Sequence, residues 1–134
     1  MILGLSHMTF IVKNLEASTA FWTDIFGAQE VYASGDRTFS VAREKFFLVG
    51  DMWICIMEGD PVKERDYSHI AFRINDSDFD DYVIKINSAG AEIKKDRSRI
   101  EGEGRSIYFY DFDNHLFELH TGVLETRLQG YSVA

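Results

Sequence analysis

Two stretches of the chain alternate apolar and polar side chains in nearly the same order. Residues 5–12 read LSHMTFIV and residues 67–74 read YSHIAFRI, so that Ser, His and Phe stand in register. Side chains two positions apart on a strand share a face, and this alternation predicts a strand at the start of each half of the chain. The sequence therefore contains a weak internal repeat.

A helical pattern follows each of these strands. Residues 15–26 gather apolar side chains on one face, with Asn14 as a candidate N-cap and Gly27 at the end. Residues 79–86 place apolar side chains at positions i, i+3, i+4 and i+7, and Gly90 ends this second helix. The two halves thus agree in their first two elements.

Three further strand-like stretches come after each helix. In the first half they cover residues 30–34, 38–49 with a turn near Arg43, and 52–57; in the second half they cover residues 92–95, 106–110 and 115–120. The last stretches also match, since MWICIMEG at 52–59 aligns with HLFELHTG at 115–122.

The simplest account of this order is a duplication. We predict an α+β fold of two βαβββ modules in a single domain of residues 1–134. Module 1 covers about residues 1–59 and module 2 about residues 67–122. Residues 60–66, with the only proline, form the linker, and a short helix and tail occupy residues 123–134.

Composition narrows the class of protein. Hydrophobic residues make up 46% and charged residues 27%, as in an ordinary folded domain. A net charge of −8 argues against nucleic acid or an anionic membrane as partner, and no apolar run is long enough to span a bilayer. The single cysteine, Cys55, excludes an internal disulfide. With no recognisable signal peptide, we expect a cytoplasmic protein.

One local cluster opposes the overall charge. Five of the fourteen basic residues fall within twelve positions: Lys94, Lys95, Arg97, Arg99 and Arg105. Such a cluster is usually a solvated face. It would also suit a small anionic substrate.

The repeat places candidate metal ligands at related positions. His7 and His69 occupy the same position on the first strand of each module, and Glu118 lies on the last strand of the second module. If each module curls its sheet into half a barrel, the equivalent positions converge on one cavity. Two imidazoles and a carboxylate with open positions suit a catalytic divalent metal.

Other residues could compete for this site. Cys55 is the repeat equivalent of Glu118, although a lone cysteine between two isoleucines is more often a small buried hydrophobe. His115 is separated from Glu118 by an odd number of positions and should face away. His120 shares the face of Glu118 and is a weaker substitute ligand.

The residues resemble a known family. The paired Ser-His strands, Glu118 and the duplication look like the vicinal oxygen chelate superfamily. Within it, the segments GLSH (4–7), REKFFL (43–48), WICIM (53–57) and EGEGRSIYFYDFDNHLFELH (101–120) resemble the FosX-type fosfomycin-resistance epoxide hydrolases. The resemblance covers nearly the whole chain.

The resemblance implies a Mn(II) enzyme that hydrates the epoxide of fosfomycin, although several first-row ions suit the same ligands. It implies a domain-swapped homodimer, with His7 from one subunit and His69 and Glu118 from the other. Glu44 would be the general base; by itself, a glutamate between Arg43 and Lys45 is typical of a surface turn. The phosphonate contacts would be Thr9, Ser106, Tyr108 and Arg127, with Trp53 near the epoxide methyl and a cap around Arg97 and Arg99.

Three alternatives remain open. A fosfomycin thiol transferase using glutathione or bacillithiol would share the metal site, but EGEG at 101–104 and Phe46 depart from the glutathione-using relatives. A non-catalytic drug-binding protein shares the fold, although the three intact ligands speak against it. A dioxygenase of the same superfamily is usually about twice as long.

Overall fold

The computed structural model describes all 134 residues and divides them into two compact units. The first unit consists of Met1–Glu64 and Phe112–His115, and the second consists of Arg65–Asp111 and Leu116–Ala134. Each unit holds one four-stranded sheet. None of the helices has the length and apolar character that crossing a membrane requires.

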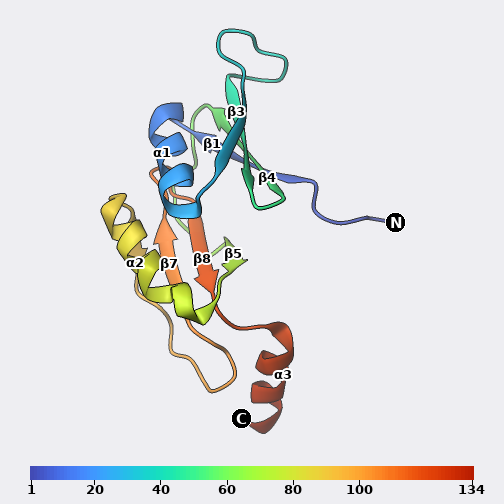
Figure 1. The fold of residues 1–134 in the computed structure, drawn as a ribbon, viewed down its shortest axis with the longest axis vertical. Helices are drawn as coiled ribbons and strands as arrows, with labels where there is room; N and C mark the ends of the chain where they lie inside the picture. Colours follow the sequence, from blue (N-terminus) through green and yellow to red (C-terminus); the bar gives the residue numbers. More distant parts are fainter. The chain divides into compact units, whose positions relative to one another are not determined.

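The first unit follows the order βαβββ (Figure 1). Its elements are β1 (His7–Val12), α1 (Leu15–Phe26), β2 (Gln29–Ala33), β3 (Glu44–Val49) and β4 (Met52–Glu58). The strands lie in the order β1-β4-β3-β2, with β1 parallel to β4 and the other pairs antiparallel.

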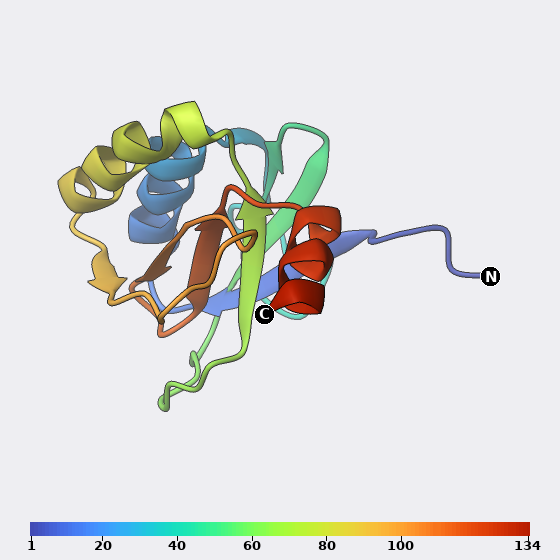
Figure 2. The ribbon, with the colours of Figure 1, turned by 90° about the horizontal axis from the view of Figure 1, so that it is seen from below.

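The second unit repeats this order. Its elements are β5 (His69–Arg73), a 3₁₀ turn η1 (Asp76–Asp78), α2 (Phe79–Ser88), β6 (Glu92–Lys94), β7 (Ser106–Tyr110), β8 (Leu116–His120) and a final helix, α3 (Leu124–Val133). The strand order β5-β8-β7-β6 matches that of the first sheet, again with its outer strand β5 parallel to β8. Figure 2 shows α2 and α3 well apart from each other around these strands. The predicted pair of βαβββ modules is confirmed.

Local sequence explains the first helix. The Asn14 side-chain oxygen accepts a hydrogen bond from the Ala17 N–H at 3.0 Å, and Gly27 ends the helix with φ 63°, a left-handed conformation that favours glycine. The helix packs on β3 and β4. Its buried Trp22 and Ile25 belong to the same core as Ile54 and Ile56, and all four side chains are essentially inaccessible to water.

One predicted strand boundary is wrong by several residues. Residues 39–42 form bends rather than the first part of a strand, so β3 begins only at Glu44. The alternation read into residues 38–43 is not a strand, because the pairing with β2 and β4 begins no earlier than Glu44. Before that residue only the Arg43 carbonyl accepts a hydrogen bond from β4, from the Glu58 N–H at 2.8 Å. The second helix ends at Ser88 with Ala89 as its C-cap, and Gly90 follows with φ 75°, the left-handed conformation in which glycine ends a helix, as predicted.

Candidate active site

Because side chains alternate along the strands, one face of the first sheet points away from α1. The register pairs His7 with Trp53 and Thr9 with Cys55, and Glu44 pairs with Met57, which lies two positions beyond Cys55 on β4. Paired residues share a face of a sheet. The candidate residues of this unit are therefore gathered on one side, opposite the core under α1.

The exposed histidine of this face lies against an aromatic ring. The ring centroids of His7 and Trp53 are 4.2 Å apart and stacked at 29°. The Ser6 hydroxyl lies 3.0 Å from His7 Nδ1. The stacking fixes the plane of the imidazole, so that Nε2 has a defined direction.

Glu44 is not the surface turn residue that its charged neighbours suggest. It begins β3, its backbone N–H donates to Ser34 Oγ at 3.0 Å, and only 7% of the residue is exposed. No protein group hydrogen-bonds to its carboxylate. The structure thus holds a nearly buried carboxylate whose oxygens have no protein partner.

Cys55 lies beside this carboxylate. Burial raises the pKa of the Cys55 thiol, and the negative charge of Glu44 raises it further, while a hydrogen bond with Thr9 acts in the opposite direction. The residue is 4% exposed. These values agree with the predicted small buried cysteine, which stays in its thiol form.

The second sheet gathers a larger polar cluster in the same way. The register pairs Glu118 with Ala71 on β5 and with Tyr108 on β7, and it pairs His120 with Ser106. His69 lies two positions before Ala71 and shares this face. The opposite face carries Phe72, Phe109, Phe117 and Leu119, which are buried.

His69 and Glu118 meet at the centre of the cluster. His69 Nδ1 lies 2.6 Å from the Tyr67 carbonyl oxygen, which accepts only, so Nδ1 carries a proton. In the neutral imidazole, Nε2 then presents its lone pair to Glu118 Oε1, 3.0 Å away. Two such atoms repel each other unless a proton or a metal cation lies between them. Their separation suits neighbouring ligands at ~2.1 Å from one divalent ion, so the residues fit a metal.

The other oxygen of Glu118 is held by hydroxyl groups. Ser106 donates to Glu118 Oε2 at 2.5 Å, and the Tyr108 hydroxyl also bonds to this carboxylate. Burial alone would raise the pKa of Glu118. The hydrogen bonds from Ser106 and Tyr108 and the nearby imidazoles of His120 and His69 outweigh it and keep this pKa below its ordinary value. The carboxylate is therefore charged and ready to bind a cation.

Tyr108 connects this carboxylate to the basic segment. Its oxygen accepts hydrogen bonds from the Tyr67 hydroxyl at 2.8 Å and from Arg99 Nη2 at 3.1 Å. Burial, then the bond with Tyr67 and the charge of Glu118, raises the pKa of Tyr108. Tyr108 therefore remains a neutral phenol.

Arg99 and Arg97 differ in how they are used. Arg99 is 10% exposed at its side chain and is bound by Asp96, while its Nη1 is buried without a hydrogen-bond partner. Arg97 is more exposed and pairs with Glu103. Arg99 Nη1 also lies 3.6 Å from Glu103 Oε2, an ion-pair distance too long for a hydrogen bond, so of the two Arg99 carries the donor that is not yet hydrogen-bonded.

Glu103 organises the loop before β7. Its carboxylate is paired with Arg97, accepts from the Ile100 N–H at 3.0 Å and lies 3.3 Å from the Tyr131 hydroxyl of α3. The hydrogen bond with Arg97, followed by that with the Ile100 N–H, lowers the pKa of Glu103 to about 2. Sequence reasoning passed over this residue; its place between Gly102 and Gly104 was the available signal.

Not all predicted ligands meet in one unit. His69 and Glu118 come together with Ser106, Tyr108 and Arg99, whereas His7 belongs to the first sheet. Within the chain, no three His, Cys, Asp or Glu side chains form a group arranged to hold a metal ion. His115 belongs to the first unit, where its ring lies edge-on to Phe10.

Comparison with known proteins decides the family. The model of the Glyoxalase/Bleomycin resistance protein/Dioxygenase superfamily matches residues 4–119. A curated relative named fosfomycin resistance protein FosX, from Listeria monocytogenes, is 62% identical over 131 residues, which cover 98% of each chain. The chain belongs to the FosX family within this superfamily.

Two further comparisons place it within the wider group. A crystal structure of a FosX mutant from L. monocytogenes, complexed with Mn(II) and 1S,2S-dihydroxypropylphosphonic acid, matches with a TM-score of 0.90 at 57% identity. It covers 98% of this chain and 99% of that one. A metallothiol transferase named FosB, from Staphylococcus epidermidis, is 36% identical over 138 residues, covering all of this chain and 94% of the relative. The FosX resemblance read from the sequence is confirmed.

Proposed function

We propose that the protein hydrates the epoxide of fosfomycin to a diol with Mn(II) as cofactor. One observation carries this proposal above the others: a FosX structure that matches nearly the whole chain holds Mn(II) and a dihydroxypropylphosphonic acid. The convergence of His69 Nε2 and Glu118 Oε1 supports it from this chain's own residues.

The metal ligands in this proposal are His7, His69 and Glu118. When bound, the metal would act as a Lewis acid that stabilises negative charge developing on the epoxide oxygen. The chain's own contribution is to prepare the ligands. The Tyr67 carbonyl fixes the tautomer of His69, and Ser106 holds the second oxygen of Glu118.

The phosphonate would be held mainly by arginines. Arg99 Nη1 has no hydrogen-bond partner, and the Arg127 guanidinium has one, His120. An arginine fork matches two oxygens of an anion. Tyr108 and, from the other sheet, Thr9 complete the proposed contacts, and Tyr108 can donate to the phosphonate only by turning its proton away from Glu118. Trp53 lines the wall near the epoxide methyl.

Ser106 is also a proposed phosphonate contact, but its present hydrogen bonds restrict what its hydroxyl can donate to. Its single hydroxyl proton is directed at Glu118 Oε2, and its oxygen faces His120 Nδ1 at 2.7 Å. It can donate to a phosphonate only by turning away from Glu118.

Glu44 would act as general base. Its carboxylate has no protein partner, so its oxygens are free to accept a proton from water. That water attacks the carbon bearing the phosphonate with inversion and breaks its C–O bond to the ring oxygen. The alkoxide left on the other carbon takes a proton from solvent, Glu44 returns its proton to solvent, and the product is a vicinal diol. The diol lacks the strained ring and no longer alkylates the target of the antibiotic.

The assembly is part of the proposal. We take the active form to be a domain-swapped homodimer in which His7 from one subunit joins His69 and Glu118 from the other. Each chain would form one domain with modules at about 1–59 and 67–122, a linker at 60–66 and a C-terminal segment at 123–134. The reduced, buried Cys55 supports a cytoplasmic location.

Product analysis tests this function. Protein stripped of metal and reloaded with Mn(II) is incubated with fosfomycin in thiol-free buffer, and the product is analysed by mass spectrometry and ³¹P NMR. The proposal predicts a product heavier by one water. A requirement for glutathione or bacillithiol, with a thiol adduct as product, would instead assign the chain to the transferases, and binding without turnover would make it a drug-binding protein.

A further inference from the structure

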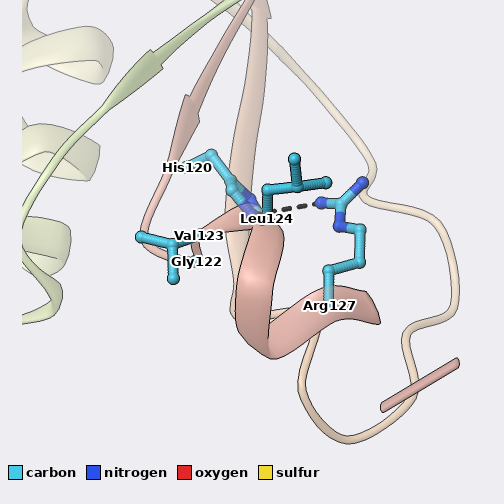
Figure 3. Close-up of a pocket in the computed structure, with 5 residues that line it drawn as sticks. All are labelled: His120, Gly122, Val123, Leu124 and Arg127. Carbon is cyan, nitrogen blue, oxygen red and sulfur yellow. Dashed lines mark hydrogen bonds between the residues drawn. The ribbon is translucent and has the colours of Figure 1, made fainter. Parts of the chain in front are cut away.

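His120 has both ring nitrogens engaged, although no role has yet been assigned to it. Nε2 lies 3.1 Å from Arg127 Nη2, and Nδ1 lies 2.7 Å from Ser106 Oγ. Figure 3 shows the imidazole and the Arg127 guanidinium facing each other beside the start of α3. The ring therefore bridges a helix and the strand β7.

The chemistry of the partners fixes the direction of each hydrogen bond. A guanidinium only donates, so His120 Nε2 accepts from Arg127 and the ring proton is on Nδ1. The Nδ1–H then donates to Ser106 Oγ, whose own proton goes to Glu118 Oε2 at 2.5 Å. The result is one directed chain of donors that runs from Arg127 through His120 and Ser106 to Glu118.

This direction excludes His120 as a metal ligand in this arrangement. The only lone pair of its ring in the plane belongs to Nε2, and that lone pair faces a cation, Arg127. The nitrogen nearer to Glu118, Nδ1, carries a proton and lies 3.3 Å from Oε2. His120, the weaker substitute ligand in the sequence, thus has both ring nitrogens in hydrogen bonds.

The backbone is shaped to hold the ring in place. A Cβ on Gly122 would lie 2.7 Å from His120 Nε2 and 2.6 Å from the Glu103 carbonyl oxygen, so only glycine fits between them. Gly122, His120 and Arg127 line a cavity of about 210 Å³ together with Val123 and Leu124. The His120 side chain is only 13% exposed.

We propose that His120 is a positioning residue that joins the phosphonate site to the metal site. Through Ser106 it holds Glu118 Oε2 and leaves Oε1 to face His69. Through Nε2 it fixes the guanidinium of Arg127, whose other nitrogens then point to the anion. This inference rests on the proposed function for the roles of Arg127 and Glu118.

Two amide substitutions separate the two hydrogen bonds. In His120→Asn the amide nitrogen can take the place of Nδ1 and donate to Ser106, but the side chain is too short to reach Arg127. In His120→Gln the amide oxygen can take the place of Nε2 and accept from Arg127, while the bond to Ser106 is lost. The pair therefore forms a matched control, with Ser106→Ala and Arg127→Ala as references.

The readouts are the dissociation constant for Mn(II), measured without substrate by electron paramagnetic resonance of the free ion, and the KM for fosfomycin. His120→Gln should weaken Mn(II) binding by roughly tenfold, as loss of an outer partner of a ligand does, and keep KM. His120→Asn should keep Mn(II) affinity and raise KM by roughly three- to tenfold. Ser106→Ala should weaken Mn(II) binding as His120→Gln does, and any rise in its KM reports its own proposed phosphonate contact. Arg127→Ala should keep Mn(II) affinity and raise KM more than His120→Asn does, because it removes the guanidinium itself.

A failure of this inference can be told apart from a failure of the proposed function. If the wild type makes no diol, the function fails, but the Mn(II) titrations still decide the role of His120. If the enzyme is active and the Asn and Gln variants show the same Mn(II) affinity, the inference is overturned. Loss of Mn(II) binding in both variants, as in Glu118→Gln, would make His120 a ligand and overturn it too. Thermal unfolding of each variant verifies that the chain is folded.

Discussion

Replacement of Glu44 by glutamine tests the catalytic part of the account most sharply. The side chain keeps its volume and loses only its charge and basicity. Because a general base contributes roughly 10²- to 10⁴-fold in rate, hydration should fall by that factor, or about 3–5 kcal/mol of activation free energy. Mn(II) affinity should stay unchanged, since Glu44 lies on β3 and is not among the proposed ligands.

The structure adds two further readouts for this variant. The charge of Glu44 raises the pKa of the Cys55 thiol, after burial, so Glu44→Gln should lower that pKa toward its ordinary value without reaching it. No protein hydrogen bond to the carboxylate is lost, so the melting temperature should not fall. Thiolate absorbance against pH and thermal unfolding measure these two quantities.

A matched control comes from the neighbouring strand. Glu58 ends β4, its side chain is 42% exposed, and it pairs with Arg43. Glu58→Gln should retain hydration and the Cys55 pKa, because exposed ion pairs contribute little. Full hydration activity in Glu44→Gln, or loss of its Mn(II) binding, would refute the reasoning.

Three further predictions address binding, stability and assembly. Arg127→Ala should raise KM by roughly 10- to 100-fold, as expected for loss of a charged hydrogen bond of ~1.5–3 kcal/mol; an unchanged saturation curve would remove Arg127 from the site. Glu103 has a folded pKa of about 2 against an ordinary 4.5, so its stabilising effect is complete above about pH 4.5 and lost as the pH falls toward 2. The melting temperature of Glu103→Gln should therefore lie below that of the wild type at pH 6 and approach it toward pH 3, and a constant gap would contradict this. Mixing His7→Ala and His69→Ala dimers, with subunit exchange, should restore about a quarter of wild-type activity, because half of the sites in each mixed dimer are intact if ligands come from two chains; no recovery would place all ligands on one chain.

Much of the fold could be predicted because the sequence repeat indicates the same order of strands and helix twice. The alternation of the sequence placed Glu118 and His120 on one face of a strand, and His7 and Thr9 on one face of another. The strand register of the structure shows the same arrangement. The face of a strand on which a side chain lies follows from its position along that strand and needs no knowledge of packing. For the same reason, the matching ends of the two modules predicted β4 and β8 closely.

The environment of single side chains could not be predicted in this way. Glu44 between two basic residues is typical of a surface turn, and its burial depends on Ser34 and on β3 beginning at that residue. The role of His120 depends on Arg127, which α3 brings back to the sheet after the loop at residues 121–123. Such contacts arise from the path of the chain in space, which hydrophobic periodicity does not contain.

Isotope labelling gives the most direct test of the central claim that water, activated on this chain, opens the epoxide. The Mn(II)-loaded protein is incubated with fosfomycin in ¹⁸O-labelled water without thiol, and the position of the label is read from the isotope shift in the ¹³C NMR spectrum. The account predicts one labelled oxygen per diol, on the carbon that bears the phosphonate. A label on the other carbon, or no diol without added thiol, would contradict it.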